Sequence, residues 1–414
     1  MEQLTDKPLW TKDFTIITLG TVVSMLGNAV AGFAIGLLVL DYTDSVFLYA
    51  FFMVCYSLPR IVMPLLAGPL LDRFSRRRAI YTLDFLSSGV YLAVFFLLRA
   101  NWFNYPVFIA IAMLVGAIDS VYTVAYDSFY PTLISRGNFT RAYSISSLIY
   151  PLATTIMVPI AGLCYQSVGL APLFLFNAVT FFLAAAAETR IRADESHEQA
   201  RGGEAYGGSR FVADFREGIR YLREEKGLAA ITAYFFVSTL AYAVVSTLTL
   251  PYFKGHPVYT VTHYTFLMAI STVGRLVGGV IHYRYRFPPQ YKFLIAVTVY
   301  LVLSVMEGTY LFLPLALMFV FQFIEGVFSV TSYNIRLSGT QNHVEDAMRG
   351  RFNGMFQMFN ILGAIVGQLI AGVLGEALPA RAVILGAMLA NIVGVFAICL
   401  PCRKAMQKIY NVDV

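Results

Sequence analysis

Long stretches of apolar residues alternate along the whole chain with short polar segments. A stretch of about 18 or more apolar residues is long enough to cross the hydrocarbon core of a bilayer as an α-helix. This pattern predicts an all-α integral membrane protein. The twelve expected membrane-spanning helices lie at about residues 14–40, 49–71, 79–98, 105–130, 144–165, 170–187, 228–252, 262–282, 293–311, 313–335, 352–374 and 380–400.

One long polar segment, at residues 188–227, divides these helices into two groups of six. We therefore expect an N-terminal six-helix bundle at 1–187, a cytoplasmic linker at 188–227, and a C-terminal six-helix bundle with a short tail at 228–414. Within the linker, apolar residues recur at helical spacing, at Phe211, Phe215, Ile219 and Leu222. This spacing predicts an amphipathic helix that lies on the inner leaflet, with a regulatory or partner-binding helix as the alternative.

The two groups of helices also resemble each other in sequence. Residues 118–124 read IDSVYTV, and residues 324–330 read IEGVFSV at the corresponding place in the second group. Arg60 in the second helix has Arg275 in the eighth helix as its approximate counterpart. Such repeats predict two six-helix units and are typical of secondary transporters.

The distribution of charge predicts the orientation of the helices. Only 13% of the residues are charged while 58% are apolar, and the formal net charge is +6. Lys and Arg concentrate on one side of the expected helices, which places that side in the cytoplasm. The basic charge therefore reflects topology and not a nucleic-acid partner. We expect a multi-pass protein of the plasma (inner) membrane with both termini in the cytoplasm.

Cysteine and histidine give no sign of metal or disulfide chemistry. The four cysteines show no disulfide framework, and the five histidines lie without ligand spacing in loops or at helix ends. We therefore expect no metal site and no cofactor. The first apolar stretch lacks a small-residue cleavage site, so we interpret it as a retained helix and not as a signal peptide.

The loop between the second and third helices carries the most specific motif. It reads Gly68-x-x-x-Asp72-Arg73 and continues into an arginine cluster that begins at Arg76. The segment 24–28, SMLGN, lies in the first helix, and Arg349-Gly350-Arg351 precedes the eleventh. On these motifs the chain resembles the major facilitator superfamily, in the branch that contains macrolide efflux pumps and the enterobactin exporter.

The resemblance implies alternating access and export of an amphipathic small molecule in exchange for protons, as in an antiporter. Asn28 stands where relatives often carry Asp, which removes one proton site. In this fold, the resemblance also places Tyr122, Tyr126 and Tyr242 on helices that face the substrate cavity. Aromatic side chains that face lipid are the alternative.

Four charges are expected near the middle of the bilayer. Arg60 and Asp119 each precede the cytoplasmic end of their helices by twelve residues, or about 18 Å. Arg275 and Glu325 are matched in the same way in the second half. An unpaired charge at that depth costs at least about 2.5–3.5 kcal/mol, so we expect the pairs Arg60–Asp119 and Arg275–Glu325. The pairs could be permanent structural links, or an acid could exchange its arginine for a proton during transport.

A second set of residues is expected to form a cytoplasmic gate. A carboxylate such as Asp72 stabilises the positive end of a nearby helix by about 0.3–1 kcal/mol, and Asp127 is placed to hold Arg73 or Arg76. The alternative is that the arginines only anchor topology. The expected gating residues are Gly68, Asp72, Arg73, Arg76, Asp127, Arg349, Gly350 and Arg351.

These observations favour a proton-coupled exporter of a lipophilic or amphipathic small molecule. A lipid translocator or a solute importer of the same fold is the alternative. An integral membrane enzyme is least favoured, because it would need a nucleophile–base or metal constellation that the sequence does not offer. The expected partners are a small-molecule substrate, protons and membrane lipids. We expect no nucleic acid, and we expect a monomer.

Overall fold

The computed structural model describes residues 8–63, 75–135, 138–192, 208–285 and 287–412. Over these residues the chain is almost wholly helical and contains no β-strand. Twelve helices in the described part are long and apolar enough to cross a membrane. The prediction of an all-α protein with twelve membrane-spanning helices is thus confirmed.

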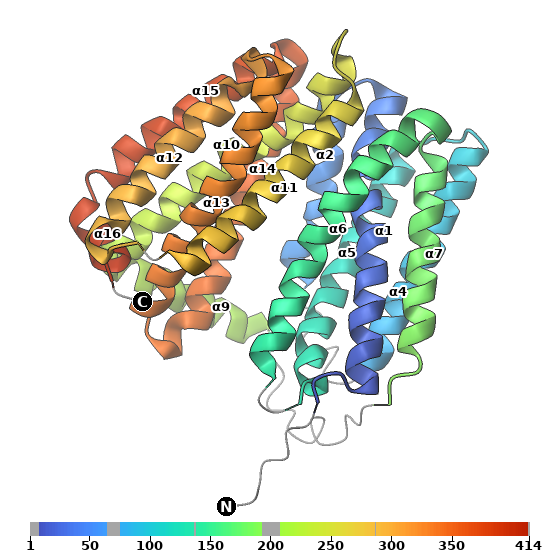
Figure 1. Ribbon diagram of the computed structural model, residues 1–414, viewed down its shortest axis with the longest axis horizontal. Helices are drawn as coiled ribbons and strands as arrows, with labels where there is room; N and C mark the ends of the chain where they lie inside the picture. Colours follow the sequence, from blue (N-terminus) through green and yellow to red (C-terminus); the bar gives the residue numbers. More distant parts are fainter. Residues whose placement is uncertain (1–7, 64–74, 136–137, 193–207, 286, 413–414) are drawn as a thin grey trace, which may run out of the picture. The chain divides into compact units, whose positions relative to one another are not determined.

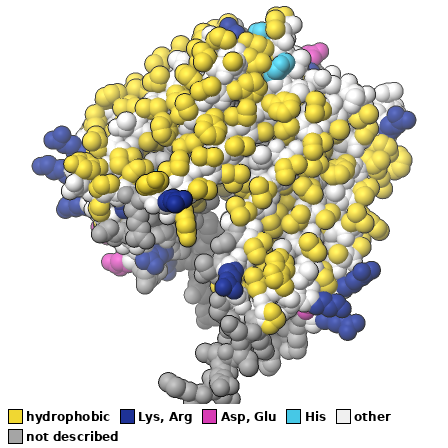
Figure 2. Space-filling model, in the orientation of Figure 1, with side chains coloured by type: hydrophobic (Ala, Val, Ile, Leu, Met, Phe, Trp, Pro, Cys, Tyr) yellow, Lys and Arg dark blue, Asp and Glu magenta, His cyan; other side chains and the backbone are white. Residues whose placement is uncertain are grey.

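The outward-facing side chains of these helices are suited to lipid. Large apolar residues are strongly exposed on several helices, for example Phe96 at 60%, Val280 at 66% and Leu294 at 62%. Figure 2 shows one face of the protein on which hydrophobic side chains dominate and most Lys and Arg side chains lie near the edges. Because such exposure would be costly in water, these surfaces are those of a multi-pass membrane protein.

The chain divides into two compact units (Figure 1). The first comprises the described parts of residues 1–43 and 55–208, and the second those of 44–54 and 209–414. The domain boundaries expected from the sequence stay a prediction. The helices with residues in the first unit are α1 (Lys12–Thr43), α2 (Val46–Ser57), α4 (Arg76–Arg99), α5 (Tyr105–Phe129), η1 (Tyr130–Leu133), α6 (Phe139–Val168) and α7 (Ala171–Glu188).

In the first unit, α7 packs against both α1 and α4. Two helix starts are fixed by side-chain caps: Ser75 Oγ accepts from the Arg78 amide at 3.2 Å, and Asn104 Oδ1 accepts from the Val107 amide at 3.3 Å. A close contact also brings α5 against the last turn of α2. A Cβ added at Gly116 would lie 2.2 Å from the Tyr56 carbonyl oxygen, so only glycine fits there.

The second unit contains the remaining helices. They are α9 (Gly208–Glu224), α10 (Lys226–Gly255), α11 (Val261–Arg284), η2 (Pro289–Tyr291), α12 (Lys292–Thr309), η3 (Tyr310–Phe312), α13 (Leu315–His343), α14 (Asp346–Ala377), α15 (Ala380–Gly394), η4 (Val395–Cys399) and α16 (Arg403–Tyr410). The closest packing is between α11 and α13 and between α10 and α14. A Cβ at Gly326 would lie 2.1 Å from the Ser271 carbonyl oxygen, which holds α13 directly against α11.

The expected amphipathic helix in the linker is present as α9. Leu222 is buried in the core of the second unit, and Ile219 packs against the same core. Gly218 lies against Met355 of α14. Part of the apolar stripe therefore faces protein, while the side chains of Phe211 and Phe215 lie outside the described residues.

One predicted helix end is wrong in a way that matters for the site. The tenth apolar stretch predicts a helix that ends at residue 335, but α13 continues to His343. Hydropathy marks the apolar part of a helix, whereas the hydrogen-bonded ladder continues into polar residues. Arg336 consequently lies about two turns inside the helix instead of at its end.

Candidate substrate and coupling site

The first unit contains the expected ion pair between Arg60 and Asp119. Arg60 Nη2 lies 2.5 Å from Asp119 Oδ2 and also donates to the Tyr56 hydroxyl at 3.2 Å. The close approach of Gly116 to Tyr56 brings the two charged side chains to the same level. Their side chains remain 45% and 33% exposed, so the pair can open without disruption of the packed core.

A small polar pocket lies beside Asp119 in the first unit. It measures about 20 Å³, which is room for about one water molecule. Of the residues predicted for the site, Asn28, Asp119 and Tyr122 line it, together with Asp84. Tyr126 is not among the lining residues, and instead stacks against the ring of Tyr122 at 6.0 Å between centroids.

Two buried acids in the first unit have no predicted role. Asp84 of α4 and Glu188 of α7 are each 1% exposed, and the two carboxyl groups interact electrostatically between these packed helices. Among the described residues, no N–H or O–H group reaches Asp84 Oδ2 or either oxygen of Glu188. A Cβ at Gly20 would lie 2.9 Å from Glu188 Oε1, so α1 covers this carboxyl closely. The sequence pattern assigned Glu188 to the polar linker, whereas the structure places it in the core.

In the second unit, the link between Arg275 and Glu325 is indirect. Arg275 Nη2 donates to Ser271 Oγ at 2.9 Å, and Ser271 Oγ donates to Glu325 Oε2 at 2.8 Å. Within the described residues the two charges form no direct ion pair, so the predicted Arg275–Glu325 pairing is wrong. The cause is the tight contact at Gly326, which places the Ser271 hydroxyl between the two side chains. This hydroxyl is a partner that charge spacing alone does not predict.

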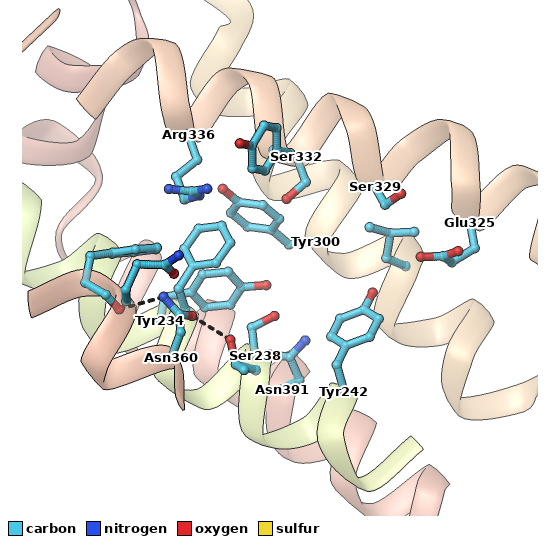
Figure 3. Close-up of a pocket in the computed structure, with 16 residues that line it drawn as sticks. Tyr234, Ser238, Tyr242, Tyr300, Glu325, Ser329, Ser332, Arg336, Asn360 and Asn391 are labelled. Atoms are coloured by element: carbon cyan, nitrogen blue, oxygen red, sulfur yellow. Dashed lines mark hydrogen bonds between the residues drawn. The ribbon is translucent and has the colours of Figure 1, made fainter. Parts of the chain in front are cut away.

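A larger cavity of about 380 Å³ lies wholly in the second unit (Figure 3). Glu325 and Tyr242 of the predicted set line it, whereas Arg275 does not. The Tyr242 hydroxyl is buried and has no hydrogen-bond partner among the described residues. The other lining residues are mostly aromatic or hydroxyl-bearing, and they are Tyr234, Phe235, Ser238, Thr239, Tyr300, Leu303, Ser329, Ser332, Tyr333, Arg336, Phe356, Gln357, Asn360 and Asn391.

Arg336 is a charged cavity residue that the sequence reasoning missed. Its guanidinium lies over the rings of Phe356, Phe235 and Tyr333, with centroid distances of 4.6, 5.2 and 5.2 Å. In Figure 3 it points toward the cavity at the end opposite Glu325. The position of Arg336 in an expected helix end concealed it, and only the cluster of aromatic residues around it could have drawn attention to it.

The residues expected at a gate are only partly described. Gly68, Asp72 and Arg73 lie outside the described residues. Arg76 Nη1 donates to the Ser128 carbonyl at 3.4 Å, and no ion pair joins it to the exposed Asp127 within the described part. The gating role of Asp127 and Arg76 stays a prediction.

The second part of the expected gate belongs to the second unit. Arg349 Nε donates to the Val344 carbonyl at 3.3 Å. Arg351 Nη1 lies 3.4 Å from Glu217 Oε2 of α9, so one of these arginines fixes the linker helix to α14. Gly350 has open space where a Cβ would stand. The role of these three residues in a gate also stays a prediction.

Twelve apolar helices that enclose charged side chains and polar cavities are features that an integral membrane protein shares with membrane transporters. The family model of the Major Facilitator Superfamily matches residues 17–360, and the chain belongs to this superfamily. The resemblance seen in the sequence motifs is thereby confirmed.

Two relatives illustrate the match in sequence. The chain is 23% identical to the uncharacterised MFS-type transporter YkuC of Bacillus subtilis, over 64% of this chain and 65% of that protein. It is also 23% identical to macrolide efflux protein A of Streptococcus pyogenes, over 65% of this chain and 67% of that protein. The matched region thus spans about two thirds of the length of each relative.

Solved structures show the same fold at much lower identity. The nucleoside transporter NupG superposes with a TM-score of 0.69 at 12% identity, covering 94% of this chain and 99% of that one. A bacterial homologue of the iron transporter ferroportin, in its inward-facing state, gives a TM-score of 0.67 at 16% identity, covering 93% and 98%. Both relationships show the fold alone.

Proposed function

We propose that this transporter exports a lipophilic or amphipathic small molecule in exchange for protons, by alternating access. The observation that carries the proposal is the cavity of about 380 Å³ in the second unit. Aromatic rings and a few polar groups form its walls, which is the usual composition of a site for a drug-sized ligand. The similarity to a macrolide efflux protein supports the direction and the amphipathic character of the substrate.

Coupling to protons rests on acids that can change partner. Asp119 is held by a direct contact with Arg60, and Glu325 lines the cavity while it accepts from Ser271. A proton on Asp119 would remove its attraction for Arg60 and free the arginine, which would join protonation to a rearrangement of α5. Glu325 is placed to respond to a substrate in the cavity. We assign the coupling role to Asp119 and the substrate-sensing role to Glu325.

The proposed setting is the plasma membrane, with both chain termini in the cytoplasm. This orientation follows from the excess of Lys and Arg in the segments assigned to that side. In this orientation protons that return to the cytoplasm would drive the substrate outward.

Uptake into inverted membrane vesicles tests the proposal. Vesicles that contain the protein are screened with amphipathic compounds, with a pH gradient and after nigericin has collapsed it. We expect accumulation of at least one compound that depends on the gradient and is absent from vesicles without the protein. Asp119→Asn should abolish this accumulation but retain exchange of the compound across the membrane. Accumulation that survives nigericin would contradict proton coupling, and accumulation only in right-side-out vesicles would favour a solute importer.

A further inference from the structure

Arg336 lies in the wall of the cavity and forms no ion pair with any residue that the structure describes. In the described part of the chain, no carboxylate lies within ion-pair distance of its guanidinium, and its N–H groups donate no hydrogen bond to a described residue. The three aromatic rings that surround it stabilise the positive charge through their faces. They do not accept hydrogen bonds in the plane of the guanidinium, so its N–H donors remain available to the cavity.

An available guanidinium in an apolar setting favours an anionic ligand. Arginine presents its donors as a rigid fork that matches the two oxygens of a carboxylate, sulfonate or phosphate. An unpaired charge inside a membrane protein is costly, so a ligand anion that pairs with Arg336 would recover that cost on binding. One polar neighbour that could offer a competing acceptor is already engaged, since Asn360 Oδ1 accepts from the Thr239 hydroxyl at 2.6 Å.

The opposite end of the cavity restricts the ligand further. Glu325 lies there, and one of its oxygens already accepts from Ser271. A second anionic group on the ligand would be repelled at that end, whereas a neutral body or a hydrogen-bond donor would be accepted. Between the two ends, the rings of Tyr234 and Tyr300 are stacked with centroids 4.6 Å apart and offer flat apolar surface.

We infer that the cavity of the second unit binds amphipathic organic anions, with one acidic group on Arg336 and a planar apolar body between the aromatic side chains. This inference names the substrate class of the proposed exporter and so rests on the proposed function. Its residues are distinct from the Arg60–Asp119 pair to which coupling is assigned. Binding can therefore be tested without transport.

Calorimetric titration of the purified full-length protein, in nanodiscs of phosphatidylcholine, tests the inference. The probes share one ring system and differ in charge: 2-naphthoate, 2-naphthamide and 2-naphthylmethylammonium. We expect 2-naphthoate to bind more tightly than both others. Arg336→Gln should weaken its binding roughly ten- to hundredfold and leave that of the amide unchanged, since the lost interaction is a charge-assisted hydrogen bond. Arg336→Lys should retain part of the affinity.

The matched control is Arg284→Gln, which removes the same charge from an exposed position at the end of α11. It should leave the binding of 2-naphthoate unchanged. Equal binding of the three probes, preference for the ammonium, or unchanged binding in Arg336→Gln would overturn the inference. Loss of amide binding in Arg336→Gln would also overturn it, because the variant would then have lost the cavity and not the anion contact.

An anionic lipid headgroup could also pair with Arg336, and a competition experiment distinguishes a lipid from a soluble organic anion as the natural ligand. Displacement of 2-naphthoate by dihexanoyl phosphatidylglycerol, but not by dihexanoyl phosphatidylcholine, supports the anion site with a lipid as its occupant. Displacement by neither supports a soluble organic anion. If 2-naphthoate binds and its binding depends on Arg336, but proton-driven transport is absent, the proposed function is contradicted and the binding inference is not.

Discussion

Asp84→Leu is expected to lower the free energy of unfolding by about 1–3 kcal/mol, whereas Asp84→Asn should change it by less than about 1 kcal/mol. The reason is the burial of both carboxyl groups. Neither oxygen of Glu188 has a donor among the described residues, nor has Asp84 Oδ2, and the two groups interact electrostatically. Two ionised carboxylates about 4 Å apart would repel by about 4 kcal/mol at an effective dielectric constant near 20. We therefore expect the two groups to share one proton, which would replace this repulsion with a hydrogen bond.

The two substitutions differ in whether they supply a donor. The amide introduced by Asp84→Asn can donate to Glu188 in place of the shared proton. Leucine fills a similar space but leaves Glu188 buried and without a partner, at about the stated cost. If both acids were ionised, Asp84→Leu would instead remove the repulsion and stabilise the protein.

Thermal unfolding of the purified variants in one detergent gives the order of stability. We expect wild type and Asp84→Asn to unfold close together and Asp84→Leu to unfold at a clearly lower temperature. Infrared spectroscopy adds an independent readout, because a protonated side-chain carboxyl has its own C=O stretching band, and Glu188→Gln should remove it. A stability of Asp84→Leu equal to or above that of wild type would refute the shared proton.

Three further predictions concern other contacts. A variant that exchanges the two charges, Arg60→Asp with Asp119→Arg, should fold like the wild type but lack proton-driven uptake into vesicles. Uptake equal to that of the wild type would show that the pair is purely structural. Glu376→Gln should lower the thermal unfolding temperature, because the carboxylate accepts from a hydroxyl and, at 3.0 Å, from a backbone N–H at the start of α2; an unchanged temperature would count against this cap. In a cysteine-free background, a cysteine at Asn101 should react with an impermeant thiol reagent in intact cells and one at Ser75 should not, and the reverse result would invert the proposed topology.

Much of the fold could be predicted from the sequence because the bilayer imposes a simple rule on segment length. Each long apolar stretch is predicted to be a helix, since only helices and closed barrels satisfy the backbone groups in lipid and a barrel strand needs only about 9–11 residues. The contact between Arg60 and Asp119 could be predicted by depth, because both helices run in the same direction and an unpaired charge is costly.

The other features of the candidate site depend on the directions of individual side chains, which hydropathy does not report. Glu188 lies just beyond an apolar stretch, so its polarity assigned it to the linker although its side chain turns into the core. Ser271 separates Arg275 from Glu325 because of a helix contact at one glycine, which spacing along the chain does not reveal. Arg336 entered the cavity because α13 extends beyond its apolar part.

The central claim is that substrate and protons move in opposite directions through one protein. Proteoliposomes that contain the purified protein and trapped pyranine report internal pH when a compound accumulated by the inverted vesicles is loaded inside and allowed to leave. The account predicts that departure of the compound acidifies the interior, and that Asp119→Asn abolishes this acidification while the compound still exchanges across the membrane. Departure of the compound without any change of internal pH, or with alkalinisation, would contradict the account.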